Sequence, residues 1–148
     1  MKTELTNLKK NKTWVLVDKP KGVKAIDLKW VFKQKSDTTF RARLVAKGFQ
    51  QSEINDNLYS PVSRIQTLKV LLVYCCKNNL FIEQMDVETT FLNGKIKGNV
   101  YVKQPPGFIR RSNKKVFKLF RSLYGLKESP RQWYDCIHDF LNFQEKKK

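Results

Sequence analysis

Histidine and cysteine are scarce in this 148-residue chain. There is one histidine, His138, and the three cysteines are Cys75, Cys76 and Cys136. An odd number of cysteines that includes an adjacent pair argues against a disulfide framework, and buried reduced thiols are the better interpretation. A single histidine without a Cys-x-x-Cys spacing argues against a structural zinc site.

Long hydrophobic runs are missing as well. The longest, residues 70–76, is far shorter than the roughly 20 residues that a membrane helix needs. The first residues, MKTELTNLKKNK, lack the apolar core of a signal peptide. We therefore expect no membrane segment and an intracellular protein.

Acidic residues are too few to balance the basic ones. The chain has 30 Lys and Arg against 13 Asp and Glu, a net charge of +17, and its 41% hydrophobic content suits one globular domain or a piece of one. Residues 1–50 carry 13 basic and 4 acidic groups, residues 51–100 carry 5 and 5, and residues 101–148 carry 12 and 4. Two basic flanks interleaved with aromatic residues indicate nucleic acid as the partner, with an acidic membrane surface as the weaker alternative.

Periodicity predicts an α+β domain with an antiparallel sheet and two long helices. Strands are expected at residues 14–17, 29–35, 40–48, 80–87, 100–104 and 116–120. The Ser-Pro pairs at 60–61 and 129–130 predict helix starts, because Ser accepts from free amides and Pro suits the first turn. Residues 1–10 form a polar, basic N-terminal extension that we expect to begin loosely.

Asp86 is the residue on which a catalytic interpretation depends. It lies near the end of the alternating run 80–87, on the face of Ile82 and Gln84 rather than that of the more apolar residues. A carboxylate placed there is either an exposed strand-end residue or a metal ligand. Two-metal phosphoryl chemistry needs a second carboxylate, and the sequence offers no obvious one.

Five ordered segments resemble the reverse transcriptase domain of copia-type retrotransposons. They are NKTWVLVDKP (11–20), KWVFKQK (29–35), RARLVAKGFQQ (41–51), QMDVETTFLNG (84–94), and YVKQPPGF (101–108) continued by KLFRSLYGLKESPRQWY (118–134). The resemblance covers the chain after residue 10. It implies a truncated reverse transcriptase domain over residues 11–148, with the fingers and part of the palm of a right-hand polymerase.

The same resemblance assigns roles near Asp86. Asp86 is similar to the first catalytic aspartate, a ligand of both Mg²⁺ ions, and the carbonyl of Val87 is expected to reach one of them. Phe91 resembles the aromatic gate that excludes a ribose 2′-hydroxyl, although spacing alone favours a core aromatic. Thr90 departs from the small Ala that the family usually has before this ring.

Further roles fall on the fingers and on the loop before the second helix. Arg41 and Arg43 resemble the residues that hold the nucleotide triphosphate, and a solvated basic face is an equally good interpretation of each alone. The family more often has Lys where Arg41 stands. Tyr124 and Gly125 look like nucleotide-binding residues, and Ser129 and Pro130 like template-binding ones. A turn with a helix cap explains the last four equally well.

The family's second metal motif, an adjacent Asp-Asp pair on a hairpin, has no counterpart here, because no two aspartates are adjacent in the sequence. We also expect neither the thumb nor the ribonuclease H domain within these 148 residues. We therefore expect a fragment of an RNA-directed DNA polymerase, using Mg²⁺, dNTP, an RNA template and a DNA primer in the full family, and inactive alone. The alternative is a non-catalytic RNA- or DNA-binding module derived from it. The family's life in virus-like particles implies a cytoplasmic location.

Overall fold

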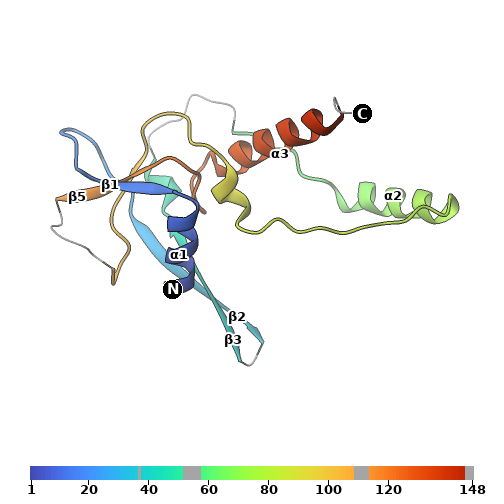
Figure 1. Ribbon diagram of the computed structural model, residues 1–148, viewed down its shortest axis with the longest axis horizontal. Helices are drawn as coiled ribbons and strands as arrows, with labels where there is room; N and C mark the ends of the chain where they lie inside the picture. The colour runs from blue at the N-terminus through green and yellow to red at the C-terminus, as the bar shows by residue number, and fades with distance from the viewer. Residues whose placement is uncertain (37, 52–57, 109–113, 146–148) are drawn as a thin grey trace.

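Antiparallel strand pairs form the frame of the chain, which we describe from a computed structural model (Figure 1). The structure describes residues 1–36, 38–51, 58–108 and 114–145. Within them, β1 (Trp14–Asp18), β5 (Lys115–Leu119) and β4 (Tyr101–Val102) make a sheet of that order, and β2 (Leu28–Ser36) and β3 (Thr39–Ala46) make a separate hairpin. Together with three helices, this confirms the predicted mixed fold with antiparallel sheets.

The three-stranded sheet follows from the alternation in its strands. Val17 pairs with Val116 and Trp14 with Leu119, and the rings of Trp14 and Phe117 stack at 4.5 Å. The strand expected at 100–104 is confirmed only at Tyr101–Val102. Val102 and Leu119 reach the main core, which includes Leu44, Leu92 and Leu123.

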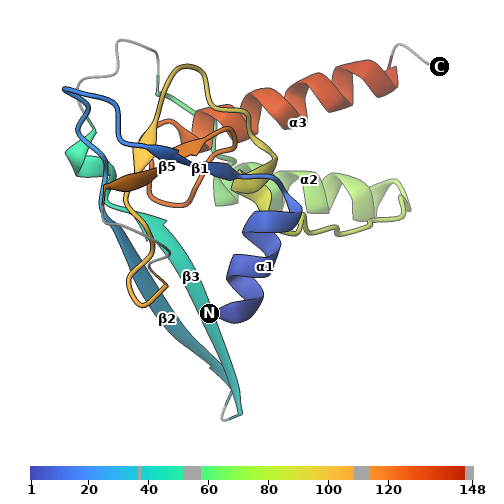
Figure 2. The ribbon, with the colours of Figure 1, turned by 60° about the vertical axis from the view of Figure 1, so that its left-hand side comes forward.

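The β2–β3 hairpin projects from this body beside the N-terminal helix (Figure 2). Arg43 lies opposite Val31 and Leu44 opposite Trp30. Leu44 and Ala46 are buried while Arg41 is exposed and Arg43 is half-buried. The predicted separation of apolar and cationic faces on β3 is thus confirmed where the strand meets the core.

The loose start expected for the N-terminal residues is wrong. Residues Lys2–Lys10 form helix α1, and Leu8 is fully buried in the core. Leu5 packs against the same core one turn earlier. The i, i+3 spacing of these two leucines is the helical signal that the polar composition concealed.

Two helices carry the predicted apolar patterns, and they differ in what covers them. Helix α3 (Ser129–Glu145) begins at the predicted Ser-Pro pair. Helix α2 (Ile65–Lys77) does not: Arg64 before it is extended, at φ −77° and ψ 146°, so the start expected at Ser60 and Pro61 is wrong by about one turn. None of the residues of α2 is buried.

The strand expected at 80–87 is also wrong. These residues follow α2 back toward the body as an irregular segment, and Figure 1 shows both extending away from the sheets. Phe81 is fully exposed and Met85 is 85% exposed. Alternating side chains favour a strand only when a neighbour supplies hydrogen bonds, and in the described part of the chain no strand pairs with this segment.

None of the described helices is long and apolar enough to cross a membrane.

Two backbones touch where β3 ends. A Cβ on Gly48 would lie 2.1 Å from the carbonyl oxygen of Gly125, and one on Gly125 would lie 2.2 Å from that of Ala46. Gly125 also has φ +89°, which favours glycine. The amide of Ala46 donates to the carbonyl of Tyr124 at 2.7 Å, which ties the loop before α3 to the strand.

Gly125→Ala should destabilise the fold strongly, because the new methyl group meets backbone atoms that cannot move aside. Gly22→Ala is the matched control: Gly22 has φ +74° and nothing near the site of a Cβ, so it reports the cost of the dihedral alone. We expect a loss of about 1 kcal/mol for Gly22→Ala and roughly 3 kcal/mol or more for Gly125→Ala in urea unfolding. Equal losses would show that the close approach is not tight.

Asp27 joins the hairpin to the three-stranded sheet. Its carboxylate accepts from Gln50 at 3.0 Å and pairs with Lys103, which follows β4, at 2.7 Å. Lys47 lies 3.8 Å away. The hydrogen bonds from Gln50 and Lys103 and the charges of both lysines lower the pKa of Asp27 below its ordinary value of 3.8.

This lowered pKa makes part of the stability dependent on acid. The contribution is present above the ordinary pKa of 3.8 and is lost as the pH falls through the lower pKa of the folded protein. Asp27→Asn should therefore reduce the free energy of unfolding at pH 7, with a smaller difference from wild type as the pH falls below 4. Asp18→Asn, at a side chain 84% exposed, is the control. A difference for Asp27→Asn that is the same at every pH would contradict the assignment.

Candidate functional site

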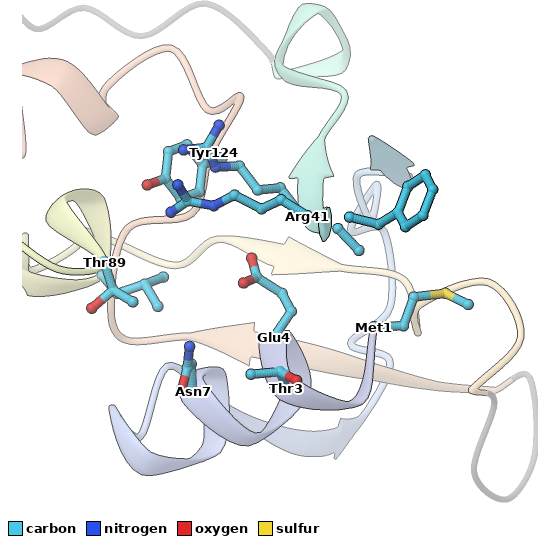
Figure 3. A pocket seen from close by; sticks show the side chains of 11 residues that line it. Met1, Thr3, Glu4, Asn7, Arg41, Thr89 and Tyr124 are labelled. Atoms are coloured by element: carbon cyan, nitrogen blue, oxygen red, sulfur yellow. The ribbon is translucent and has the colours of Figure 1, made fainter. Parts of the chain in front are cut away.

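A pocket of about 210 Å³ lies where α1, β3 and the loop before α3 meet. β3 contributes Arg41 and Arg43. Helix α1 contributes Glu4 and the loop contributes Tyr124, which Figure 3 shows together with Arg41. Thr89 and Leu92, on either side of Phe91, close another side. Four segments that are distant in sequence therefore line one pocket, and two of the lining residues carry guanidinium groups.

Arg43, Tyr124 and Phe91 form a stack beside the pocket. The guanidinium carbon of Arg43 lies 5.1 Å from the centroid of the Tyr124 ring, and the Phe91 ring meets Tyr124 edge to face at 4.9 Å and 70°. The Nε of Arg43 is buried without a hydrogen-bond partner among the described residues. A buried donor without a partner is costly, and an anionic ligand with oxygen acceptors would satisfy it.

The local backbone explains this meeting of side chains. Arg43 is on the cationic face of β3, and the Ala46 to Tyr124 hydrogen bond fixes the loop against the end of that strand. Phe91 is presented by the short helix η2 (Thr90–Asn93), which begins after Thr89 at φ +50°. Sequence reasoning predicted each of the three residues singly, and the structure brings all three together.

Asp86 lies outside this cluster. It is exposed, does not line the pocket, and belongs to the irregular segment that replaces the expected strand. The Val87 carbonyl accepts from the Thr90 hydroxyl at 2.8 Å. Asp86 lies only a few residues before η2, so the position of its carboxylate depends on how the irregular segment 80–87 packs.

Comparison with known proteins decides the family. The family model described as "Reverse transcriptase (RNA-dependent DNA polymerase)" matches residues 11–148. The chain belongs to this reverse transcriptase family.

Relatives place the reverse transcriptase chain among retrotransposon polyproteins. It is 41% identical over 152 residues to the Retrovirus-related Pol polyprotein from transposon TNT 1-94 of Nicotiana tabacum, covering 97% of this chain and 11% of the relative. The Pol polyprotein from transposon RE1 of Arabidopsis thaliana is 36% identical, covering 88% and 10%. The Ty1-NL2 Gag-Pol polyprotein of Saccharomyces cerevisiae is 35% identical, covering 93% and 8%. The chain thus spans about a tenth of these relatives, and the resemblance to copia-type elements is confirmed. No solved structure matches.

The magnesium site expected at Asp86 and Val87 is not complete in the described part of the reverse transcriptase chain. A site for divalent magnesium needs several oxygen ligands, and the described residues hold no group of three or more His, Cys, Asp or Glu side chains that could bind a metal. Asp86 and Val87 alone therefore do not fit a pair of ions. Their roles as ligands stay predictions.

The predicted template residues lie at the start of α3. The Ser129 hydroxyl is buried and donates to the Leu123 carbonyl at 2.6 Å, while Pro130 is exposed. Ser129 thus has a structural partner, and Pro130 remains accessible. Gly125 contacts the β3 backbone, as described above. The roles of all three toward nucleotide or template stay predictions.

Helix α3 carries an ion pair between two residues one turn apart. Arg131 binds Asp135 at 2.9 Å, one turn away. The pair lines a more open groove of about 860 Å³ between α3 and residues 93–97, which also holds Lys95 and Arg121. This groove is basic overall and shares no lining residue with the pocket.

Glu4 is the charged pocket residue that sequence reasoning missed. Its helix was taken for a loose extension, so no contact with β3 was expected. The i, i+3 spacing of Leu5 and Leu8, which both pack in or against the core, predicts a helix that includes Glu4.

Proposed function

We propose that this chain forms the nucleotide-binding fingers and part of the palm of a retrotransposon RNA-directed DNA polymerase. The family match and the polyprotein relatives support this proposal. In the complete enzyme the reaction is template-directed addition of a dNTP to a DNA primer on an RNA template. The right-hand arrangement of the whole enzyme is part of the proposal.

The observation that carries the proposal is the cluster of Arg43, Tyr124 and Phe91. Arg43 offers a buried donor that has no partner among the described residues, beside a pocket that Arg41 also lines. Two guanidinium groups suit the bidentate binding of a triphosphate. Tyr124 orients Arg43 by stacking, and Phe91 packs edge to face against Tyr124. From its resemblance to the aromatic gate of the family, we assign Phe91 to the sugar of the nucleotide.

Asp86 supplies one carboxylate of the proposed two-metal site. When bound, the two magnesium ions would neutralise charge that develops on the transferred phosphoryl group. Further carboxylates must come from elsewhere in the polymerase, because the described residues do not assemble a metal site. The 148 residues alone should therefore bind nucleotide without joining it to a primer.

Arg43→Ala should weaken binding of dTTP by roughly tenfold or more, because it removes a charged donor to the phosphates. Lys29→Ala is the control, since it removes the same charge from an exposed position on β2 outside the pocket. Isothermal titration calorimetry of the full chain measures both affinities. Equal affinities in the two variants would contradict a nucleotide role for Arg43, and no binding of dTTP by wild type would contradict the proposed function.

Primer extension tests whether the chain is inactive alone. With a poly(rA) template, an oligo(dT) primer, dTTP and magnesium, we expect no extension above background by wild type or by Asp86→Asn. Magnesium-dependent extension by the wild type that Asp86→Asn abolishes would show that the chain assembles a working metal site by itself.

A second candidate is a non-catalytic module that binds RNA or DNA. The net charge of +17 favours it, because phosphate contacts by Lys and Arg give affinity without chemistry. Both candidates bind nucleic acid with salt-sensitive affinity, so such binding does not separate them. Binding of a free nucleotide at Arg43 does, because a module that follows only the nucleic-acid backbone has no use for this pocket.

A further inference from the structure

Helix α1 places a carboxylate in the pocket that holds the two arginines. Glu4 rises from α1 into the hollow that Arg41 and Tyr124 also face (Figure 3). It is the acidic side chain among the residues that line this pocket. Residues 2–10 precede the segment that matches the reverse transcriptase family model, which starts at residue 11.

Glu4 is held by the edge of β3 rather than by the arginines. Its Oε1 accepts from the Leu44 amide at 3.3 Å, which is long for a bond to a carboxylate. Leu44 follows Arg43 in β3, and its amide faces the edge of the strand that does not pair with β2. On the same edge the Ala46 amide donates to the Tyr124 carbonyl. Among the described ion pairs within 4 Å, neither Arg41 nor Arg43 has a carboxylate partner.

The pocket thus holds an anion that leaves its cations unsatisfied. In the described part of the chain the buried Nε of Arg43 has no partner, although Glu4 lies in the same hollow. With α1 in place the pocket measures about 210 Å³, below the roughly 300 Å³ at which ligand pockets usually begin. A triphosphate would add several negative charges beside a carboxylate that is already there.

From this geometry we infer that Glu4 competes with the nucleotide for the arginine pocket and so sets the affinity of the site. Binding of a triphosphate turns the Glu4 side chain out of the pocket and breaks its contact with the Leu44 amide. The arginines then bind phosphate oxygens in place of facing a distant carboxylate. This inference rests on the proposed nucleotide-binding function.

Glu4→Gln tests the competition, because glutamine keeps an oxygen that accepts from Leu44 and removes only the charge. We expect dTTP and inorganic tripolyphosphate each to bind roughly three- to tenfold more tightly to Glu4→Gln than to wild type, in calorimetric titrations of the full chain. Glu83→Gln is the matched control, since Glu83 is exposed and lies outside the pocket. It should change the affinity little.

Glu4→Ala separates competition from a structural role. Competition predicts that this variant also binds both probes more tightly than wild type. A purely structural Glu4 predicts unchanged binding for Glu4→Gln and weaker binding for Glu4→Ala. That pattern, or equal gains for Glu4→Gln and Glu83→Gln, overturns the inference while leaving the proposed function intact. Absence of binding by all variants overturns the proposed function itself.

Hydrogen exchange of the wild-type chain gives a second measurement that needs no variant. The Leu44 amide donates to Glu4, so it should exchange faster when saturating tripolyphosphate draws Glu4 away. The Ala46 amide, which donates to Tyr124, is the internal control and should keep its exchange rate. An unchanged Leu44 rate with tripolyphosphate bound would overturn the inference.

Discussion

The contact between the backbones at Gly48 and Gly125 holds the site in place. Each glycine leaves room for a carbonyl oxygen that a side chain would displace. Because these two segments of the backbone can approach this closely, the Ala46 amide reaches the Tyr124 carbonyl, and the Tyr124 ring reaches the Arg43 guanidinium. Phe91 and the start of α3 are then placed relative to that ring. A candidate site assembled from distant segments thus depends on two positions without side chains.

Local patterns were enough to predict most of the elements that bury one face, although not α1. β1, β2, β3, β5 and α3 all appear near their expected positions, because alternation and the helical stripe report burial directly. The segment 80–87 has an equally clear alternation and still forms no strand, since a strand needs hydrogen bonds from a neighbour. The side-chain pattern of a segment shows which secondary structure it can form, and the neighbouring elements decide whether that structure forms.

The candidate site could be predicted residue by residue but not as an arrangement. The alternation in β3 put Arg41 and Arg43 on one face, and the resemblance to a family pointed to Tyr124 and Phe91. Nothing local could show that Arg43 stacks on Tyr124, because the two lie some 80 positions apart and meet only through the loop contact. Glu4 escaped notice for a similar reason, since its partner is a backbone amide on β3.

Helix α2 has a thermodynamic consequence for the whole chain. Its 13 residues bury none of their side chains in the described structure, and an isolated helix of that length is marginal in water. Its helix–coil equilibrium is therefore set by its own residues and is separate from the cooperative unit around Leu44 and Leu123. Since α2 and residues 80–87 are exposed before unfolding, they add little to the heat-capacity change or to the urea m-value. Both quantities should report a folding unit smaller than the chain.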